Sequence, residues 1–323
     1  MKNLVLRAAC AVFAFAVMAP LVWAAPASYN FQTVISPGDP AFTQLLGINN
    51  SSTIAGYYGD GTTIPNNGFT LVLPNSYTPE NVPAAMQTQV IGINNVGWTD
   101  GFYVDAGGTT HGFTFNGGSF TNVDAPATAF NQLLGINDGG TAVGYSSTDP
   151  GGGILQRSFT VSGTTFTYID GLLPAGAQNN QAVGINNAGT VAGFFQDASG
   201  VFHGYLITGT TETTLNFPGA MDTQAFGVNN KGEVVGIYID GSMVQHGFTY
   251  IGGVWTTVDD PLGVGSTLIN GVNDLGQLVG FYVDANGNTD GLVATPTPEP
   301  GSLVLLGSGL LAGLGVLRRK LLA

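Results

Sequence analysis

A six-fold internal repeat is the feature that most constrains this 323-residue chain. A Gly-Ile/Val-Asn-Asn/Asp motif recurs at intervals of 43 to 49 residues, beginning at Gly47, Gly92, Gly135, Gly184, Gly227 and Gly271. A second glycine follows each start by nine residues, and a glutamine precedes five of the six by three: Gln44, Gln89, Gln132, Gln181 and Gln224. Self-similarity with this period predicts a ring or stack of equivalent structural units.

Each copy predicts four short strands. In the second copy, β-branched and aromatic segments at 89–93, 99–104, 111–115 and 120–123 are separated by turns rich in Asn, Asp and Gly. Such segments are typical of strands joined by hairpins. The Asn-Asn/Asp-x-Gly segment predicts a turn that is capped by the Asn or Asp side chain and ends on a glycine at positive φ.

Four strands in a period near 44 residues favour a propeller blade. We therefore predict an all-β fold, a six-bladed β-propeller of four-stranded antiparallel blades over residues 28–295. Copy six ends after its third strand, at 291–294, and residues 31–37 parallel residues 120–126 at the end of copy two. The N-terminal strand is thus expected to close the ring, and the paired glycines to allow close backbone approach near the axis. The alternative is a β-solenoid, whose coils are usually shorter.

The N-terminal segment predicts export. Lys2 and Arg7 precede an apolar run at 8–23, and small residues follow at 24–27. This order is typical of a secretory signal peptide, which we place at residues 1–24, with cleavage after residue 24 or 27. An uncleaved N-terminal anchor is the alternative.

The C-terminal tail has three parts in a fixed order: Pro298-Glu299-Pro300, an uncharged apolar run at 302–317, and the basic cluster Arg318, Arg319 and Lys320. The run is expected to form a helix just under the length that spans a membrane, with the basic cluster on the cytoplasmic side. Residues 296–323 resemble the PEP-CTERM sorting signal of Gram-negative bacteria. The resemblance implies processing by an exosortase-type machinery after transient membrane anchoring. An ordinary C-terminal anchor is the alternative. This type of tail is also known as an ice-binding protein C-terminal domain, which implies nothing about ice here.

Charge excludes one class of partner. All 20 acidic residues except Glu299 lie in 28–295, whereas Arg157 and Lys231 are the only basic residues there. Nucleic-acid binding depends on phosphate neutralisation by Lys and Arg, so we expect no nucleic-acid partner. The one cysteine, Cys10, lies in the predicted signal peptide, so the exported body has no disulfide and depends on packing and sheet hydrogen bonds.

The body also resembles the extracellular HAF-type repeat family. The matching residues are the Gly-Ile-Asn-Asn motif with its trailing glycine and the triplets that begin at His111, His203 and His246. Asn67, Arg157 and Asp290 replace the histidine in the other copies. The resemblance implies a repeat architecture outside the cell and no particular chemistry.

No residue set predicts catalysis or a bound cofactor. The three histidines fall on different copies, so they are expected to lie too far apart to share a zinc ion. Aspartates recur after the second strand, and Asp60, Asp105, Asp197, Asp240 and Asp284 are weak Ca²⁺ candidates. They lack the spacing of a dedicated calcium loop, and Asp beside Gly is also common in tight turns.

We therefore predict a non-enzymatic binding or structural module at the cell surface or in the extracellular matrix, with polysaccharide or a surface protein as partner. A secreted propeller hydrolase or lyase acting on glycans is the alternative, because two suitably spaced carboxylates would suffice. Ice or mineral binding is a third hypothesis. It rests on Thr and Asn richness alone, and no flat, regular threonine array is evident.

Overall fold

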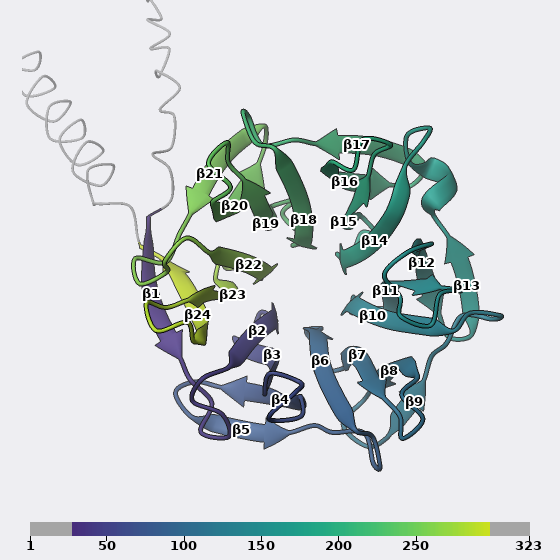
Figure 1. Ribbon diagram of the computed structural model, residues 1–323, viewed down its shortest axis with the longest axis horizontal. Coiled ribbons are helices and arrows are strands. Elements are labelled where there is room, and N and C mark those ends of the chain that lie inside the picture. Colours follow the sequence, from purple (N-terminus) through teal and green to yellow (C-terminus); the bar gives the residue numbers. More distant parts are fainter. Residues whose placement is uncertain (1–27, 298–323) are drawn as a thin grey trace, which may run out of the picture.

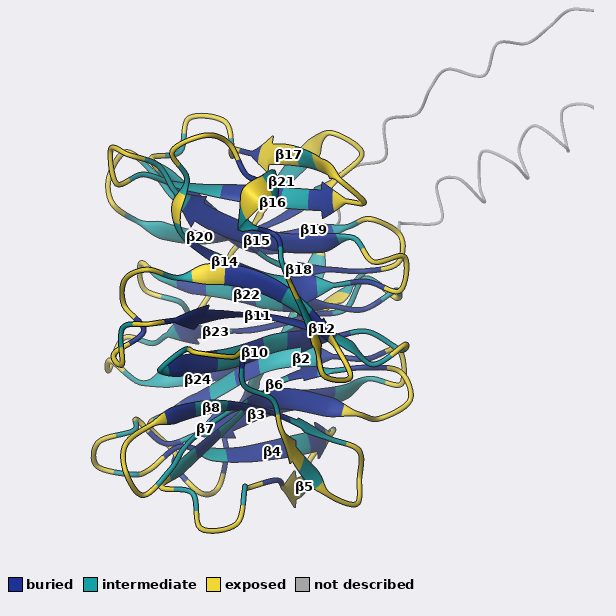
Figure 2. Ribbon diagram, turned by 90° about the vertical axis from the view of Figure 1, so that its right-hand side faces the viewer, coloured by how far each residue is buried: buried dark blue, intermediate teal, exposed yellow. Residues whose placement is uncertain are grey.

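The computed structural model describes residues 28–297. These residues form a ring of short strands around a central axis, with the first strand of each repeat innermost (Figure 1). Seen from the side, the strands lie in buried layers and the loops form the exposed surface (Figure 2).

The described chain contains 24 strands and one 3-10 helix, η1 (Asp170–Leu172). Repeats one to three comprise β2 (Thr43–Ile48), β3 (Thr53–Tyr58), β4 (Asn67–Val72), β5 (Ser76–Pro79), β6 (Gln87–Ile93), β7 (Thr99–Val104), β8 (Thr110–Phe115), β9 (Phe120–Asn122), β10 (Phe130–Ile136), β11 (Thr141–Ser147), β12 (Arg157–Ser162) and β13 (Thr165–Tyr168). Repeats four to six comprise β14 (Gln178–Ile185), β15 (Val191–Gln196), β16 (Phe202–Thr208), β17 (Thr211–Leu215), β18 (Asp222–Val228), β19 (Val234–Ile239), β20 (Gln245–Ile251), β21 (Val254–Val258), β22 (Thr267–Val272), β23 (Leu278–Val283), β24 (Thr289–Pro296) and β1 (Tyr29–Val34).

The hydrogen-bonded sheets correct the predicted blade count. Four antiparallel sheets of four strands stand alone, not six, and the strands of repeats two and three form one eight-stranded sheet. The two halves of that sheet join through a single parallel residue pair, Phe130 with Thr110. The reason is local: the start of β10 lies beside the start of β8, close enough for their main chains to pair.

The first and last strands of the described chain meet, as the sequence predicted. β1 pairs antiparallel with β24, with Phe31 opposite Ala294 and Val34 opposite Gly291. The main-chain N–H of Thr297 then donates to the carbonyl oxygen of Ser28 at 2.8 Å. Both ends of residues 28–297 therefore lie at the outer edge of repeat six (Figure 1).

The core lies between neighbouring sheets. A large apolar residue at one position of strand three is buried in every repeat: Phe69, Phe113, Phe159, Tyr205, Phe248 and Leu292. At the axis the main chains approach closely, as expected from the motif glycines. A Cβ on Gly47 would lie 2.7 Å from the carbonyl oxygen of Ile91, and one on Gly184 2.7 Å from that of Phe226. Glycine is needed at these positions because any side chain would push neighbouring first strands apart.

Several predictions fall on the termini. The signal peptide at 1–24, the apolar helix at 302–317 and most of the sorting signal lie outside the described residues. Within residues 28–297, no helix has the length and apolar character needed to cross a membrane.

Candidate functional site: the axial channel

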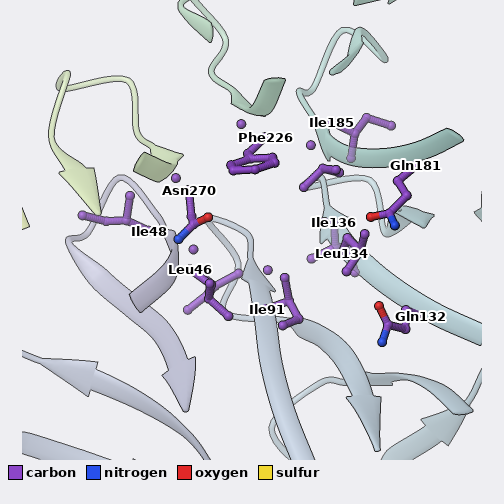
Figure 3. A pocket seen from close by; sticks show the side chains of 18 of the residues that line it. Leu46, Ile48, Ile91, Gln132, Leu134, Ile136, Gln181, Ile185, Phe226 and Asn270 are labelled. Carbon is purple, nitrogen blue, oxygen red and sulfur yellow. The ribbon is translucent and has the colours of Figure 1, made fainter. Parts of the chain in front are cut away.

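A β-bulge in the first strand of every repeat shapes the axis. The register shifts by one residue at the position before the motif glycine in all six repeats. A bulge leaves one residue unpaired and can re-aim its side chain. The side chains at this position line the axis: Leu46, Ile91, Leu134, Val183, Phe226 and Asn270 (Figure 3).

These side chains surround a cavity of about 420 Å³. The five repeat glutamines also line it, and some of their amide groups are held in place. The Tyr57 hydroxyl donates to Gln44 Oε1 at 2.7 Å, and Gln89 Nε2 donates to Asn66 Oδ1 at 2.7 Å. Among the described residues that line the cavity, none carries a carboxylate, an amine, a guanidinium, an imidazole, an aliphatic hydroxyl or a thiol. The channel therefore offers an apolar wall and amide groups.

A closed ring of asparagines lies at one end of the channel. The first Asn of each motif donates from Nδ2 to the main-chain oxygen of the equivalent Asn in the next repeat, at 2.9–3.2 Å. The members are Asn49, Asn94, Asn137, Asn186, Asn229 and Asn273. We call this set the inner asparagine ring. It joins all six repeats through side chains.

A second ring is formed by the next residue of each motif. Each main-chain N–H donates to the side-chain Oδ1 of the following repeat at 2.8–2.9 Å. The members of this outer ring are Asn50, Asn95, Asp138, Asn187, Asn230 and Asp274. The two aspartates stand three repeats apart, so every asparagine has one of them as a neighbour. All four asparagine amides donate to these carboxylates, at 2.6–3.0 Å.

The amide bonds decide the protonation state of the outer ring. Partial burial alone would raise the pKa of Asp138, but hydrogen bonds from Asn95 and Asn187 outweigh it and hold that pKa below its usual value. The pKa of Asp274 is lowered in the same way by Asn230 and Asn50. Both carboxylates are thus ionised acceptors at neutral pH.

The turn cap that the motif predicted is present. The same asparagine side chain has a second role, which the sequence did not predict. Asn49 Oδ1 accepts from the N–H groups of Ser51 and Thr53, both at 3.0 Å, as a turn cap should. The turn uses only the oxygen of the side chain, and the NH₂ group makes the inner ring. The signal available in the sequence was the presence of Asn, never Asp, at this position in all six copies.

The hairpin aspartates each cap their own turn. Asp105 Oδ1 accepts from Gly107 and Thr109, at 2.8 and 2.9 Å. Equivalent bonds to main-chain N–H groups occur at Asp60, Asp197, Asp240 and Asp284. Such bonds lower the pKa of all five carboxyls. They lie on separate hairpins, and no group of three metal-ligating side chains occurs within residues 28–297. Calcium binding there stays a prediction.

Each of the three histidines contacts the aspartate of its own hairpin, and in repeat four Nε2 of His203 lies 3.3 Å from Asp197. His111 lies between two carboxylates, with Nδ1 2.6 Å from Asp124 and Nε2 3.3 Å from Asp105. Partial burial would lower the pKa of His111, but the two aspartates outweigh it and raise that pKa. His246 has the same arrangement with Asp259 and Asp240, and its pKa is raised for the same reason.

Two acidic residues that break the repeat pattern, Glu80 and Asp100, were not identified from the sequence. Glu80 replaces an apolar residue at the end of strand four, and its carboxylate hydrogen-bonds the Thr99 hydroxyl. Asp100 is fully buried where the other copies have Ala or Val, and its Oδ2 has no partner in the described structure. Burial raises the pKa of Glu80 to about 7 and that of Asp100 to about 8. Aligning the six copies column by column would have found them.

Comparisons with known proteins identify the tail and the fold. The PEP-CTERM protein-sorting motif matches residues 296–320. A mutant of AofleA from Arthrobotrys oligospora superposes with a TM-score of 0.51 at 10% identity, over 82% of this chain and 86% of that one. The Aleuria aurantia lectin, described as a six-bladed beta-propeller with a novel fucose recognition mode, gives 0.49 at 10% identity, over 80% and 97%. Trypanosoma rangeli sialidase gives 0.46 at 11% identity, over 87% and 56%. No curated protein sequence matches this chain.

The class of protein follows from these observations. The described residues form an all-β propeller with four-stranded antiparallel blades. The PEP-CTERM motif that follows is a substrate signal for exosortase-type sorting, so the chain is an exported bacterial protein sorted to the cell surface.

Proposed function

We propose that this protein is a non-enzymatic binding module at the cell surface or in the extracellular matrix of a Gram-negative bacterium, and that its axial channel takes part of a neutral polysaccharide. The observation that carries this proposal is the lining of the 420 Å³ cavity. Apolar walls with a few placed polar groups are typical of small-molecule sites, and this volume falls in their usual range.

Charge selects the ligand class. The channel wall is neutral, while the chain as a whole has a net charge of −13. A polyanion such as an acidic glycan or nucleic acid would meet long-range repulsion and no counter-charge. A neutral glycan would meet neither obstacle, and amide groups such as those of Gln132 and Gln224 can exchange hydrogen bonds with its hydroxyls.

The glycan hydrolase alternative finds less support. General acid catalysis needs a carboxyl whose pKa is raised and which reaches the substrate. Within residues 28–297 the pKa is raised for five carboxyls, those of Glu80, Asp100, Glu233, Asp260 and Asp290. All of them except Glu233 are buried, and the relative exposures of Glu80 and Asp100 are 6% and 0%. Thr99 and Asp100 are consecutive in β7, so their side chains point to opposite faces of the sheet. Glu80, which bonds Thr99, therefore does not face Asp100 across one cleft.

The test is retention of the purified full-length protein on immobilised neutral polysaccharides, compared with a channel variant. Leu134→Trp replaces an aliphatic side chain of the channel wall with a larger aromatic one. Phe226 shows that the channel accepts an aromatic side chain. Val254→Trp, at a 55%-exposed position on β21, is the matched control. We expect retention of the natural protein and the control, and loss in Leu134→Trp. Equal retention of all three, or retention of none, would end the channel proposal.

A further inference from the structure

Repeats one and five carry different residues at one structurally equivalent position. In the connection that enters each of these repeats, one residue donates its main-chain N–H to the side chain of a threonine at the start of strand one. Ser36 donates to Thr43 Oγ1 at 2.9 Å, and Phe217 donates to Thr223 Oγ1 at 2.9 Å. The same bond therefore places Ser36 and Phe217 at equivalent positions in the ring.

In repeat five, Phe217 fills an aromatic site. Its ring stacks on Tyr238 with centroids 3.7 Å apart and planes 6° from parallel. Trp255 contacts it edge-on at 5.4 Å, and Phe248 lies at 6.3 Å. The residues that surround Phe217 thus accept one flat six-membered ring.

In repeat one, the aromatic residues remain but the filling ring is missing. Strand register makes Tyr58, Phe69 and Tyr77 the equivalents of Tyr238, Phe248 and Trp255. A cavity of about 310 Å³ lies there, lined by Ser36, Pro37, Gly38, Tyr58, Gly68, Phe69, Tyr77, Pro79 and Asn81. Gly38 forms part of its wall: a Cβ at that position would lie 2.4 Å from Cζ of Tyr58.

The chemistry of this cavity is amphipathic and uncharged. Aromatic and proline rings make up most of its wall, and no ionisable carboxyl, amine or imidazole is among its described lining residues. Asn81 is exposed, and its Oδ1 accepts from the N–H of Gly68 at 2.9 Å. The NH₂ group of Asn81 is therefore available to donate at the opening. Tyrosine rings provide an apolar face together with a polar hydroxyl.

We propose that this cavity, the repeat-one pocket, binds one neutral hexopyranose ring, with the apolar face of the sugar against the tyrosine rings and its hydroxyls towards Asn81. A pyranose is a six-membered ring comparable in size to the phenyl ring that fills the equivalent site in repeat five. It satisfies both the apolar wall and the amide at the opening, whereas a purely apolar ring satisfies only the first. The inference rests on the proposed function for its ligand class, but it names a site separate from the axial channel.

A reciprocal exchange tests the pocket. Ser36→Phe supplies the ring that repeat five uses and closes the pocket, and Phe217→Ser removes that ring and opens a second one. The probe is a panel of neutral methyl hexopyranosides, followed by saturation-transfer NMR and by titration calorimetry with the full-length protein. We expect binding of one sugar per natural chain, loss of at least tenfold in affinity in Ser36→Phe, and two sites per chain in Phe217→Ser. Circular dichroism checks that both variants are folded.

The Leu134→Trp variant distinguishes sugar binding in this pocket from sugar binding in the channel. Methyl hexopyranoside binding that survives Leu134→Trp and is lost in Ser36→Phe supports the pocket, even if polysaccharide retention through the channel fails. Binding that is lost in Leu134→Trp and kept in Ser36→Phe assigns the sugar to the channel and overturns the pocket. Absence of any binding to the natural protein overturns it as well. If Phe217→Ser does not fold, the comparison of Ser36→Phe with Leu134→Trp still decides between these outcomes.

Discussion

The side-chain amide of Asn273 donates a hydrogen bond to the main-chain oxygen of Asn49, 3.0 Å away and 224 residues earlier in the chain. This bond completes the inner asparagine ring, and the pairing of β1 with β24 completes the outer part of the same junction. The ring is thus closed both at the axis and at the rim.

The inner ring can be separated from the turn cap by substitution at one of its members. Asn186 accepts two main-chain bonds through Oδ1, from Ala188 and Thr190, and donates one through Nδ2 to Asn229. Asn186→Ala removes all three and should lower the free energy of unfolding by about 2–4 kcal/mol, at roughly 1 kcal/mol per bond. Asn186→Asp keeps the cap and removes the donor, so it should also destabilise. Chemical denaturation measures both.

The matched control for that pair is Asn116→Ala. Asn116 Oδ1 also caps a turn, accepting from Gly118 and Ser119, but at an exposed hairpin and without a bond to another repeat. Its loss should cost less than about 1 kcal/mol. A neutral effect of Asn186→Asp would show that only the cap contributes.

The outer ring predicts acid sensitivity. Because the folded pKa values of Asp138 and Asp274 lie below those of the unfolded chain, their stabilising effect is complete above about pH 4 and lost as pH falls through the folded values. Asp138→Asn combined with Asp274→Asn should lower stability at pH 7 and flatten its decline between about pH 5 and pH 2. Thermal melts across this range test the prediction, and an unchanged acid slope would contradict it.

Asp100 predicts the opposite pH dependence. Its pKa is raised to about 8, so the folded state holds a proton that the unfolded state releases near pH 4. Stability attributable to this group therefore falls as pH rises from about 4 to about 8. Asp100→Val copies Val143, Val235 and Val279 at the equivalent positions. It should stabilise the protein at pH 8 by about 1–4 kcal/mol and remove that decline. Destabilisation at pH 8 would indicate that Oδ2 has a partner in solution.

Removal of β1 should destabilise the whole ring. Deletion of residues 28–34 leaves β24 as an unpaired edge and uncovers the core cluster that contains Leu292 and Ala294. An exposed edge strand also promotes self-association. We expect a lower melting temperature and concentration-dependent aggregation by light scattering. Deletion of 298–323 is the control, since it leaves every strand of residues 28–297 in the chain. Equal melting temperatures for the two deletions would contradict this account.

The sequence by itself determined the local structure and the order of the parts. Glycine spacing, Asn-rich turns and β-branched and aromatic segments predicted the strands, the capped hairpins and the match of 31–37 to a fourth strand. Turn chemistry and strand preference act within a few residues, so the local sequence is enough to show them. The sorting tail was predicted from its resemblance to the PEP-CTERM signal, which depends on a short contiguous motif, and the match at residues 296–320 confirms it.

Tertiary structure decided what depends on neighbouring repeats. The bulged residues could be assigned to a channel only once six first strands met at the axis, and the NH₂ groups of the inner ring needed acceptors 43 to 49 residues away, or 224 at the junction. Sheet continuity between repeats two and three rested on one residue pair. The cavity beside Ser36 depended on which ring fills the same space in another repeat. These particular contacts depend on how neighbouring repeats pack, and no local sequence pattern predicted them.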